Sequence, residues 1–239
     1  MSVAVVGTDT GVGKTAVTAA ILARLRDRTR RTAGSEATGE AVDPPRAIKP
    51  AQTGYPEDDD AGYVRWACED EDAAVRLRTY GEPLAPAVAA RRAEDPIVYD
   101  RLLADTRAAM AATNRAVVEG AGGLRVPLSN DPPREIIDLV ADLGVPALVV
   151  ARSGLGTLNH TALTVDALRR RAVPVTGVVL NRYTGESAAE RTNPGELERM
   201  CDAPVWTLPE AALDSPADLR ALAEHLPPLA DLLTVDRDR

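Results

Sequence analysis

The sequence predicts an α/β fold in which a doubly wound, mostly parallel sheet carries helices on both faces. Four short apolar runs are continuous instead of alternating, which is typical of strands buried on both faces. These runs lie at 2–7, 116–118, 147–150 and 177–180. Stretches with helical periodicity separate them, and this alternation of strand and helix is the pattern of a parallel sheet.

Helices are predicted between and after these strands. The clearest start signal is Asp95 followed by Pro96, because a capping carboxylate and a proline in the first turn both favour a helix N-terminus. The predicted helices span 14–27, 95–113, 134–143, 158–171, 195–200 and 218–233.

The 239 residues fit one domain spanning 1–239. Segment 29–45 is poor in large apolar residues and rich in Gly, Ser, Thr, Glu and Pro, so we interpret it as a surface insertion. No apolar run approaches the roughly 18 residues that span a bilayer. Cys68 and Cys201 lack the spacing of a disulfide framework or a zinc site. We therefore expect a cytoplasmic protein without a membrane partner.

The charge balance opposes binding to nucleic acid, because 36 acidic against 28 basic residues give a net charge of −8. Only two basic residues are lysines, Lys14 and Lys49. A compact ammonium is therefore expected to matter at these two positions. The acidic, lysine-poor composition also suggests a host with a salty cytoplasm, although a GC-rich genome would itself account for abundant Arg and Ala.

Residues 7–15 read GTDTGVGKT and lie between the first strand and the first helix, where a P-loop must lie. Glycines let successive backbone N–H groups face an anion, and the helix start adds its positive dipole end. Lys14 would reach the β- and γ-phosphates of ATP, and the Thr15 hydroxyl would join Mg²⁺. The strict motif has glycine where this chain has Thr8, so the loop is a variant. The fold is expected to be of the P-loop NTPase type.

Four segments resemble those of dethiobiotin synthetases and follow the same order: GTDTGVGKT at 7–15, IKPAQTG at 48–54, VEGAGGL at 118–124 and LGTLNHT at 155–161. The resemblance covers most of the chain. It implies an ATP- and Mg²⁺-dependent ligase that carboxylates 7,8-diaminononanoate with CO₂. Ring closure to dethiobiotin would follow through a carbamate and a carbamic-phosphoric anhydride. It also implies a homodimer, because 156–159 resembles the segment that binds the substrate carboxylate from the neighbouring subunit.

The resemblance also implies the site residues. The expected catalytic residues are Lys49, Lys14 and Thr10, and the expected metal-binding residues are Thr15, Asp60 and Glu119. The expected substrate-binding residues are Thr53, Gly156, Thr157, Leu158 and Asn159. The expected nucleotide-binding residues are Gly11, Val12, Gly13, Lys14, Thr15, Ala16, Asp60, Glu119, Gly120, Ala121, Gly122, Asn181, Arg182 and Pro209. Among them Asn181 looks like the residue that reads adenine.

Physical chemistry supports these roles independently, because negative charge accumulates when a carbamate attacks a phosphoryl group. Two ammonium groups and a Mg²⁺ ion suit such a transition state. Mg²⁺ prefers oxygen ligands and retains several waters, so one hydroxyl and two carboxylates are a sufficient set. The neighbouring Asp58 and Asp59 are interpreted as a solvated face.

Two other functions compete with this interpretation. An amidoligase of the cobyrinate diamide synthase type would need a glutaminase domain with a nucleophilic cysteine, for which the chain has no room. A nucleotide switch ATPase would need a second P-loop lysine where this chain has Asp9, or an N-K-x-D motif where residues 181–184 read NRYT. Release of ADP that depends on the diamine would discriminate the ligase from both.

Overall fold

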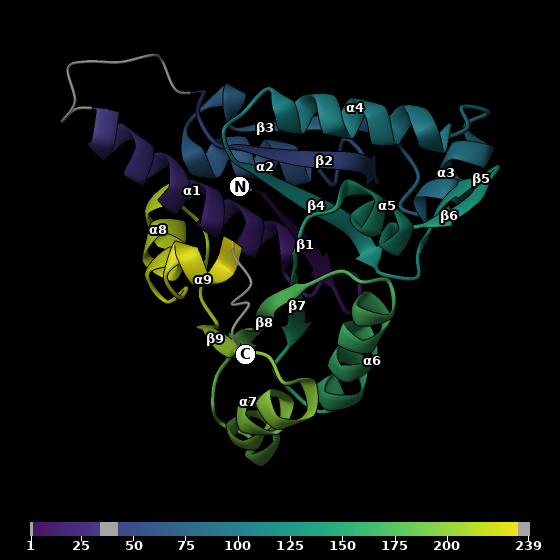
Figure 1. Ribbon diagram of the computed structural model, residues 1–239. Helices are drawn as coiled ribbons and strands as arrows, with labels where there is room; N and C mark the ends of the chain where they lie inside the picture. The colour runs from purple at the N-terminus through teal and green to yellow at the C-terminus, as the bar shows by residue number, and fades with distance from the viewer. Residues whose placement is uncertain (1, 34–42, 234–239) are drawn as a thin grey trace.

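The computed structural model describes residues 2–33 and 43–233 (Figure 1). Its main sheet has seven strands in the order β3-β2-β4-β1-β7-β8-β9, and every neighbouring pair is parallel. The strands are β1 (Val3–Gly7), β2 (Arg46–Thr53), β3 (Ala74–Tyr80), β4 (Ala116–Gly123), β7 (Ala147–Arg152), β8 (Val175–Tyr183) and β9 (Val205–Pro209). A separate antiparallel pair is formed by β5 (Pro127–Asn130) and β6 (Pro133–Glu135).

Helices cover both faces of the main sheet, which confirms the predicted fold class (Figure 1). One face carries α1 (Lys14–Ala33), α2 (Asp60–Cys68), α8 (Pro216–Glu224) and α9 (Leu229–Leu233). The other face carries α3 (Pro86–Arg92), α4 (Tyr99–Ala111), α5 (Ile136–Leu143), α6 (Thr157–Arg170) and α7 (Ala188–Cys201). None of the helices in the described ranges has the length and apolarity that crossing a bilayer requires.

Strand β1 shows why the strands read as continuous apolar runs. Val3 and Val5 pack in the core beneath α1, whereas Ala4 and Val6 pack in the core beneath α5 and α6. Because successive side chains point to opposite faces and both faces are covered, no polar position is left for alternation.

Two predicted elements differ from the structure near the N-terminal half. Helix α1 continues to Ala33, past the predicted end at 27, so the first residues of the predicted insertion 29–45 are helical. Residues 34–42 of that insertion lie outside the described residues. Helix α4 begins at Tyr99 instead of following an Asp95 cap, because the Asp95 carboxylate forms an ion pair with Arg78 at 2.6 Å.

Three boundaries also differ in the C-terminal half. Helix α7 begins at Ala188, well before the predicted 195, because Ser187 and Glu190 form a reciprocal capping box. Pro194 lies inside this helix and concealed it from the sequence pattern. The predicted helix 218–233 is two helices, α8 and α9, and α5 begins at Ile136 because 133–135 pair with β5.

Candidate active site

The phosphate loop joins β1 to α1 at the carboxyl edge of the sheet, where doubly wound proteins bind ligands. Gly13 has a φ of +100°, and a Cβ there would lie 1.9 Å from Asn181 Nδ2. The Asn181 amide also donates to Val12 O at 3.1 Å, so the end of β8 braces the loop. Lys14 is buried, and its Nζ donates to Asp9 O at 3.0 Å.

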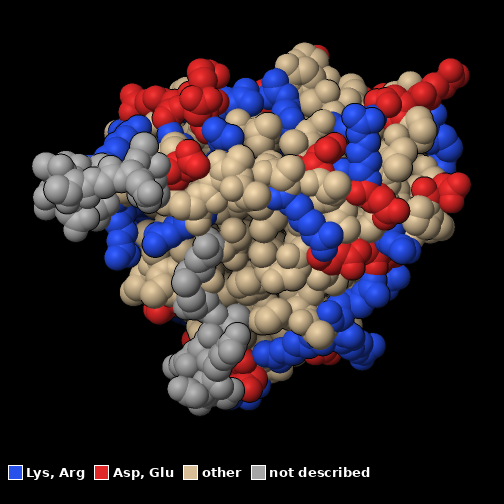
Figure 2. Space-filling view, turned by 45° about the horizontal axis from the view of Figure 1, so that its top comes forward, with Lys and Arg blue, Asp and Glu red and all other residues tan. Residues whose placement is uncertain are grey.

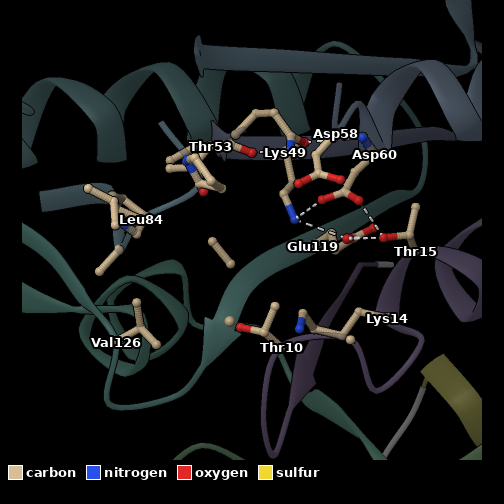
Figure 3. Close-up of a pocket in the computed structure, with 18 of the residues that line it drawn as sticks. Thr10, Lys14, Thr15, Lys49, Thr53, Asp58, Asp60, Leu84, Glu119 and Val126 are labelled. Carbon is tan, nitrogen blue, oxygen red and sulfur yellow. Dashed lines mark hydrogen bonds and ion pairs between the residues drawn. The ribbon is translucent and has the colours of Figure 1, made fainter. Parts of the chain in front are cut away.

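A second lysine meets two carboxylates beside this loop (Figure 3). Lys49 from β2 lies 2.5 Å from Asp60 Oδ2 and 3.0 Å from Glu119 Oε1, and it also donates to Gly120 O at 3.0 Å. The Thr15 hydroxyl lies 2.6 Å from Asp60 Oδ1 and 2.9 Å from Glu119 Oε1. Segments far apart in sequence therefore bring one ammonium, two carboxylates and one hydroxyl into mutual contact.

Burial and charge shift the pKa values of this cluster in different directions. Burial, together with the positive charge of Lys49, lowers the pKa of Lys14 to about 8. Burial alone would lower the pKa of Lys49, but the negative charges of Glu119 and Asp60 outweigh this effect, so the Lys49 pKa is raised. The effect of Lys49 on Lys14 indicates that the two ammonium groups share one electrostatic environment.

The pKa values of the two carboxylates, Glu119 and Asp60, also shift in opposite directions. Burial raises the pKa of Glu119, with the nearby Asp60 charge adding to it. Burial would also raise the pKa of Asp60, but the charge and hydrogen bonds of Lys49, together with Thr15, hold it below its usual range. Asp60 therefore stays ionised, which suits a cation ligand.

The oxygens of Thr15, Asp60 and Glu119 form the donor set predicted for Mg²⁺. Within the described ranges, no cluster of three or more His, Cys, Asp or Glu side chains could hold a metal ion. A cation here would thus rest on two carboxylates and a hydroxyl, and water and phosphate oxygens would complete an octahedron. The donors fit a hard, oxygen-preferring ion and do not fit zinc.

A cavity of about 550 Å³ opens over this cluster. One side is polar and carries the lysines and carboxylates, while Leu84 and Val126 lie across from them in Figure 3. The lining residues that the sequence predicted are Thr10, Gly11, Gly13, Lys14, Thr15, Lys49, Thr53, Asp60, Glu119, Ala121, Gly122 and Arg182. Both lysines of the chain therefore face one cavity.

The other predicted residues do not line this cavity: Val12, Ala16, Gly120, Asn181, Pro209, Gly156, Thr157, Leu158 and Asn159. Gly120 and Asn181 still contact the site through Lys49 and the phosphate loop. Pro209 ends β9 and pairs with Tyr183 of β8. Residues 156–159 form the start of α6, next to Leu155, which is 97% exposed.

Sequence reasoning missed several residues at the cavity. Gln52 accepts a hydrogen bond from Asp60 N at 3.2 Å and thereby holds the first residue of α2. Asp58 is exposed, as interpreted, but it also lines the cavity. Asp59, also interpreted as solvated, instead caps α2 and pairs with Arg76, as a structural carboxylate does. Gln52 lies inside the segment 48–54 and could have been found there. Further lining residues without a sequence signal are Ala51, Pro83, Leu84, Ala85, Pro86 and Val126.

A buried polar network supports the other edge of the site. The Glu190 carboxylate accepts from Ser153 Oγ at 2.7 Å and from Thr184 Oγ1 at 2.8 Å. Ser153 Oγ also lies 3.0 Å from Arg182 O, and Arg182 has a left-handed φ of 55°. Hydrogen bonds from Ser153 and Thr184 lower the pKa of Glu190 to about 2. Helix α7 therefore fixes the strand ends that carry Arg182 and the loop before α6.

Comparison with known proteins gives sequence relatives over nearly the whole chain. A family model described as an AAA domain matches residues 1–232. The chain is 50% identical over 236 residues to the ATP-dependent dethiobiotin synthetase of Haloferax mediterranei, covering 98% of this chain and 95% of that protein. It is 46% identical over 212 residues to the ATP-dependent dethiobiotin synthetase of Anaeromyxobacter sp. strain K (86% and 88% covered) and 40% identical over 222 residues to that of Saccharopolyspora erythraea (91% and 91%).

Solved structures share the fold at much lower identity. The cell division ATPase MinD of Pyrococcus furiosus has a TM-score of 0.57 at 17% identity, covering 94% of this chain and 97% of that one. A ParA family ATPase of Chlorobium tepidum also has a TM-score of 0.57, at 12% identity, with 97% and 93% covered. These matches show that the chain shares the overall fold of these structures.

Proposed function

The chain belongs to the family of ATP-dependent dethiobiotin synthetases, ligases of biotin biosynthesis, and from this membership we propose that its site makes dethiobiotin from 7,8-diaminononanoate, CO₂ and ATP. The observation that carries the residue assignments is the meeting of Lys14 and Lys49 at one cavity beside the phosphate loop. Every step of the reaction below produces or moves negative charge at that place.

The first step forms a carbamate. An uncharged amine of the substrate attacks the carbon of CO₂, a C–N bond forms, and the nitrogen loses a proton to leave R–NH–COO⁻. Lys49 is the cation best placed to hold this carboxylate, because its ammonium is buried and already oriented by Asp60, Glu119 and the carbonyl of Gly120. Thr10 and Thr53 line the same cavity, and their hydroxyl groups would form hydrogen bonds with the substrate amines.

The second step transfers a phosphoryl group. A carbamate oxygen attacks the γ-phosphorus of ATP, the bond to the bridging oxygen breaks, and ADP leaves with its electron pair. Lys14 and the N–H groups of the phosphate loop would neutralise the phosphates. The product is a carbamic-phosphoric anhydride held between the two lysines.

The third step closes the ring. The second amine attacks the carbonyl carbon of the anhydride, phosphate leaves, and a proton is released as the cyclic urea forms. This step depends on holding the amine close to the carbonyl, so it needs no side-chain nucleophile. The cavity supplies the required confinement with fixed walls on the polar side and the apolar side.

We assign Thr15, Asp60 and Glu119 to Mg²⁺, which would supply charge neutralisation at the β- and γ-phosphates when bound. Lys49 and Thr15 hold both carboxylates in fixed orientations. The protein side of the metal site is therefore organised before any ligand arrives.

The apolar wall of Leu84 and Val126 suits the methylene chain of the substrate, with the diamine turned toward the lysines (Figure 3). The carboxylate at the far end of the chain would then leave the cavity. Backbone N–H groups at the start of α6, residues 156–159, would bind it from a second subunit, since within its own chain this segment does not line the cavity. Exposed Leu155 beside that segment is consistent with such an interface.

Asn181, Arg182 and Pro209 are proposed to bind the nucleotide at its base end. Arg182 lines the cavity, and Asn181 touches the phosphate loop. We assign ATP as the nucleotide, as in the relatives described as ATP-dependent.

The cysteines argue against an amidoligase. Burial raises the pKa of Cys68 to about 11 and also raises the pKa of Cys201, and both thiols are buried. A nucleophilic cysteine needs the opposite conditions. The nucleotide switch is disfavoured by the absence of a second lysine in the phosphate loop, where Asp9 stands.

The test is a coupled assay of ADP release with bicarbonate, Mg·ATP and the diamine, with dethiobiotin identified by mass spectrometry. We expect ADP release to require the diamine and to equal dethiobiotin formation. ADP release that is unaffected by the diamine would refute the ligase and favour the switch. Sedimentation of the wild type and of Leu155→Asp tests the dimer, with wild-type monomers as the contradicting outcome.

A further inference from the structure

Asp58 is a carboxylate of the cavity that the reaction steps above leave unused. It lines the same cavity as Asp60 and Glu119, and Figure 3 shows it on their side. Asp60 and Glu119 are bonded to Lys49 and Thr15. The Asp58 side chain, in contrast, has no hydrogen bond or ion pair with any residue that the structure describes. Asp58 is exposed where it lines the cavity, so its negative charge is available to a ligand.

The local backbone holds Asp58 in this position. Asp58 N donates to Gly54 O at 2.8 Å, which closes the turn between β2 and α2. Gly54 has a φ of +77°, and a Cβ there would lie 2.6 Å from Asp58 Oδ2. A side chain at Gly54 would thus collide with the carboxylate. The missing side chain of Gly54 lets the Asp58 carboxylate fold over the turn, next to Thr53 at the cavity wall.

Charge in the cavity explains why such a carboxylate is useful. The substrate amines are alkylamines, and like the lysine side chain they are largely protonated near neutrality. Apart from Asp58, the cavity lining carries three cations, Lys14, Lys49 and Arg182, and two anions, Asp60 and Glu119, which leaves one net positive charge. A positively charged diamine is disfavoured there unless a further anion faces it.

We propose that Asp58 binds the protonated amine of the diamine and thereby admits a cationic substrate to a site built for anions. This inference rests on the proposed function. Asp58 accepts an N–H from the ammonium of one amine while the other, uncharged amine attacks CO₂, and the ammonium loses its proton to solvent before it attacks the anhydride. The pairing orients the diamine end of the substrate toward the lysines and the methylene chain toward Leu84. A water-bridged contact of Asp58 to the metal is the competing role, and the experiment below discriminates the two.

The experiment compares Asp58→Asn with Glu57→Gln, a matched control that removes one negative charge from an exposed neighbour outside the cavity. Binding of 7,8-diaminononanoate and of nonanoate, which lacks both amines, is measured by calorimetry without metal or nucleotide. We expect Asp58→Asn to bind the diamine about 10- to 100-fold more weakly, as loss of a charge-assisted contact predicts. Its affinity for nonanoate should not fall, and Glu57→Gln should match the wild type for both ligands.

Three outcomes would overturn the role of Asp58. These are unchanged diamine binding by Asp58→Asn, equal loss for diamine and nonanoate, or a defect that shows only as a raised Mg²⁺ requirement during turnover. Thermal unfolding and ADP binding of the variant check that it is folded. If the wild type forms no dethiobiotin, the proposed function itself fails. If the wild type forms it while Asp58→Asn binds the diamine normally, only the inference about Asp58 fails.

Discussion

Replacing Lys49 tests the central assignment most directly. Its ammonium contacts three acceptors, Asp60 Oδ2 at 2.5 Å, Glu119 Oε1 at 3.0 Å and Gly120 O at 3.0 Å. In Lys49→Arg the charge is retained, but a planar guanidinium in this 5% exposed position cannot address three acceptors arranged around one nitrogen. In Lys49→Met the charge is lost, and two carboxylates remain close together without a counter-ion.

The expected magnitudes follow from these contacts. Removing one partner of a buried ion pair lowers the free energy of unfolding by about 3–5 kcal/mol. For a domain of this size, Lys49→Met should therefore lower Tm by about 6–20 °C. Lys49→Arg keeps a cation, and its cost is that of overpacking, about 1–3 kcal/mol. For activity, kcat should fall about 100- to 1000-fold in both variants, because Lys49→Met loses the charge positioned at the developing carbamate and Lys49→Arg displaces it.

The assay pairs diamine-dependent ADP release with calorimetric binding of ADP. We expect turnover to fall steeply while ADP still binds, because Lys14 and the phosphate loop are unchanged. Turnover of Lys49→Arg within about threefold of the wild type would refute the claim that a compact ammonium is needed there. Loss of ADP binding together with turnover would show that Lys49 acts on the phosphate loop instead of on the carbamate.

Three further predictions follow from other parts of the molecule. Burial lowers the pKa of Lys14 to about 8, and a bound phosphate would stabilise the protonated ammonium. The affinity for ADP, measured by calorimetry, should therefore fall as pH rises above 8, by up to about tenfold per pH unit. In Lys14→Met the ADP affinity should not change over this pH range. Glu190→Gln weakens the acceptor that Ser153 and Thr184 share, so KM for ATP should rise several-fold with little change in kcat. An unchanged KM would show that α7 does not help to position the nucleotide-binding residues. With a net charge of −8 and acidic and basic groups interspersed over the face in Figure 2, the unfolding temperature should rise from low to multimolar KCl, and a flat response would remove the hypothesis of a salty host.

Only part of the polar side of the site could be predicted from apolar strands. Glu119 directly follows the predicted apolar run 116–118, and parallel strands place their carboxyl ends at one edge of the sheet. Lys49 lies on β2, which no predicted apolar run contains, and it was predicted from the scarcity of lysine and from the resemblance. Leu84 and Val126 could not be found in this way, since they lie in connections with no motif and reach the cavity through tertiary packing. Asp58 is exposed, as the sequence interpretation expected, but a run of three aspartates gives no indication that this one also lines the cavity.

Element boundaries failed where local signals conflicted with long-range contacts. Pro194 predicts a helix end, yet α7 continues through it, because Ser187 and Glu190 already cap the helix and Glu190 is bonded to Ser153. Asp95 predicts a helix start, yet Arg78 on β3 claims its carboxylate. The Ser187–Glu190 capping box is a local signal that the sequence analysis missed, whereas the Arg78 partner of Asp95 is distant in sequence and lies outside the window that predicts a helix start.

The packing of α8 and α9 against α1 has a consequence for synthesis of the protein. Arg24 of α1 donates to the carbonyls of Leu226 and Pro227 at 2.8 Å each, and Leu219 and Leu232 are fully buried in the core shared with α1. Residues 216–233 thus cover the helix that follows the phosphate loop. A nascent polypeptide that still lacks them would leave apolar side chains of α1 exposed to water, so this helix cannot complete its packing until those residues have been synthesised.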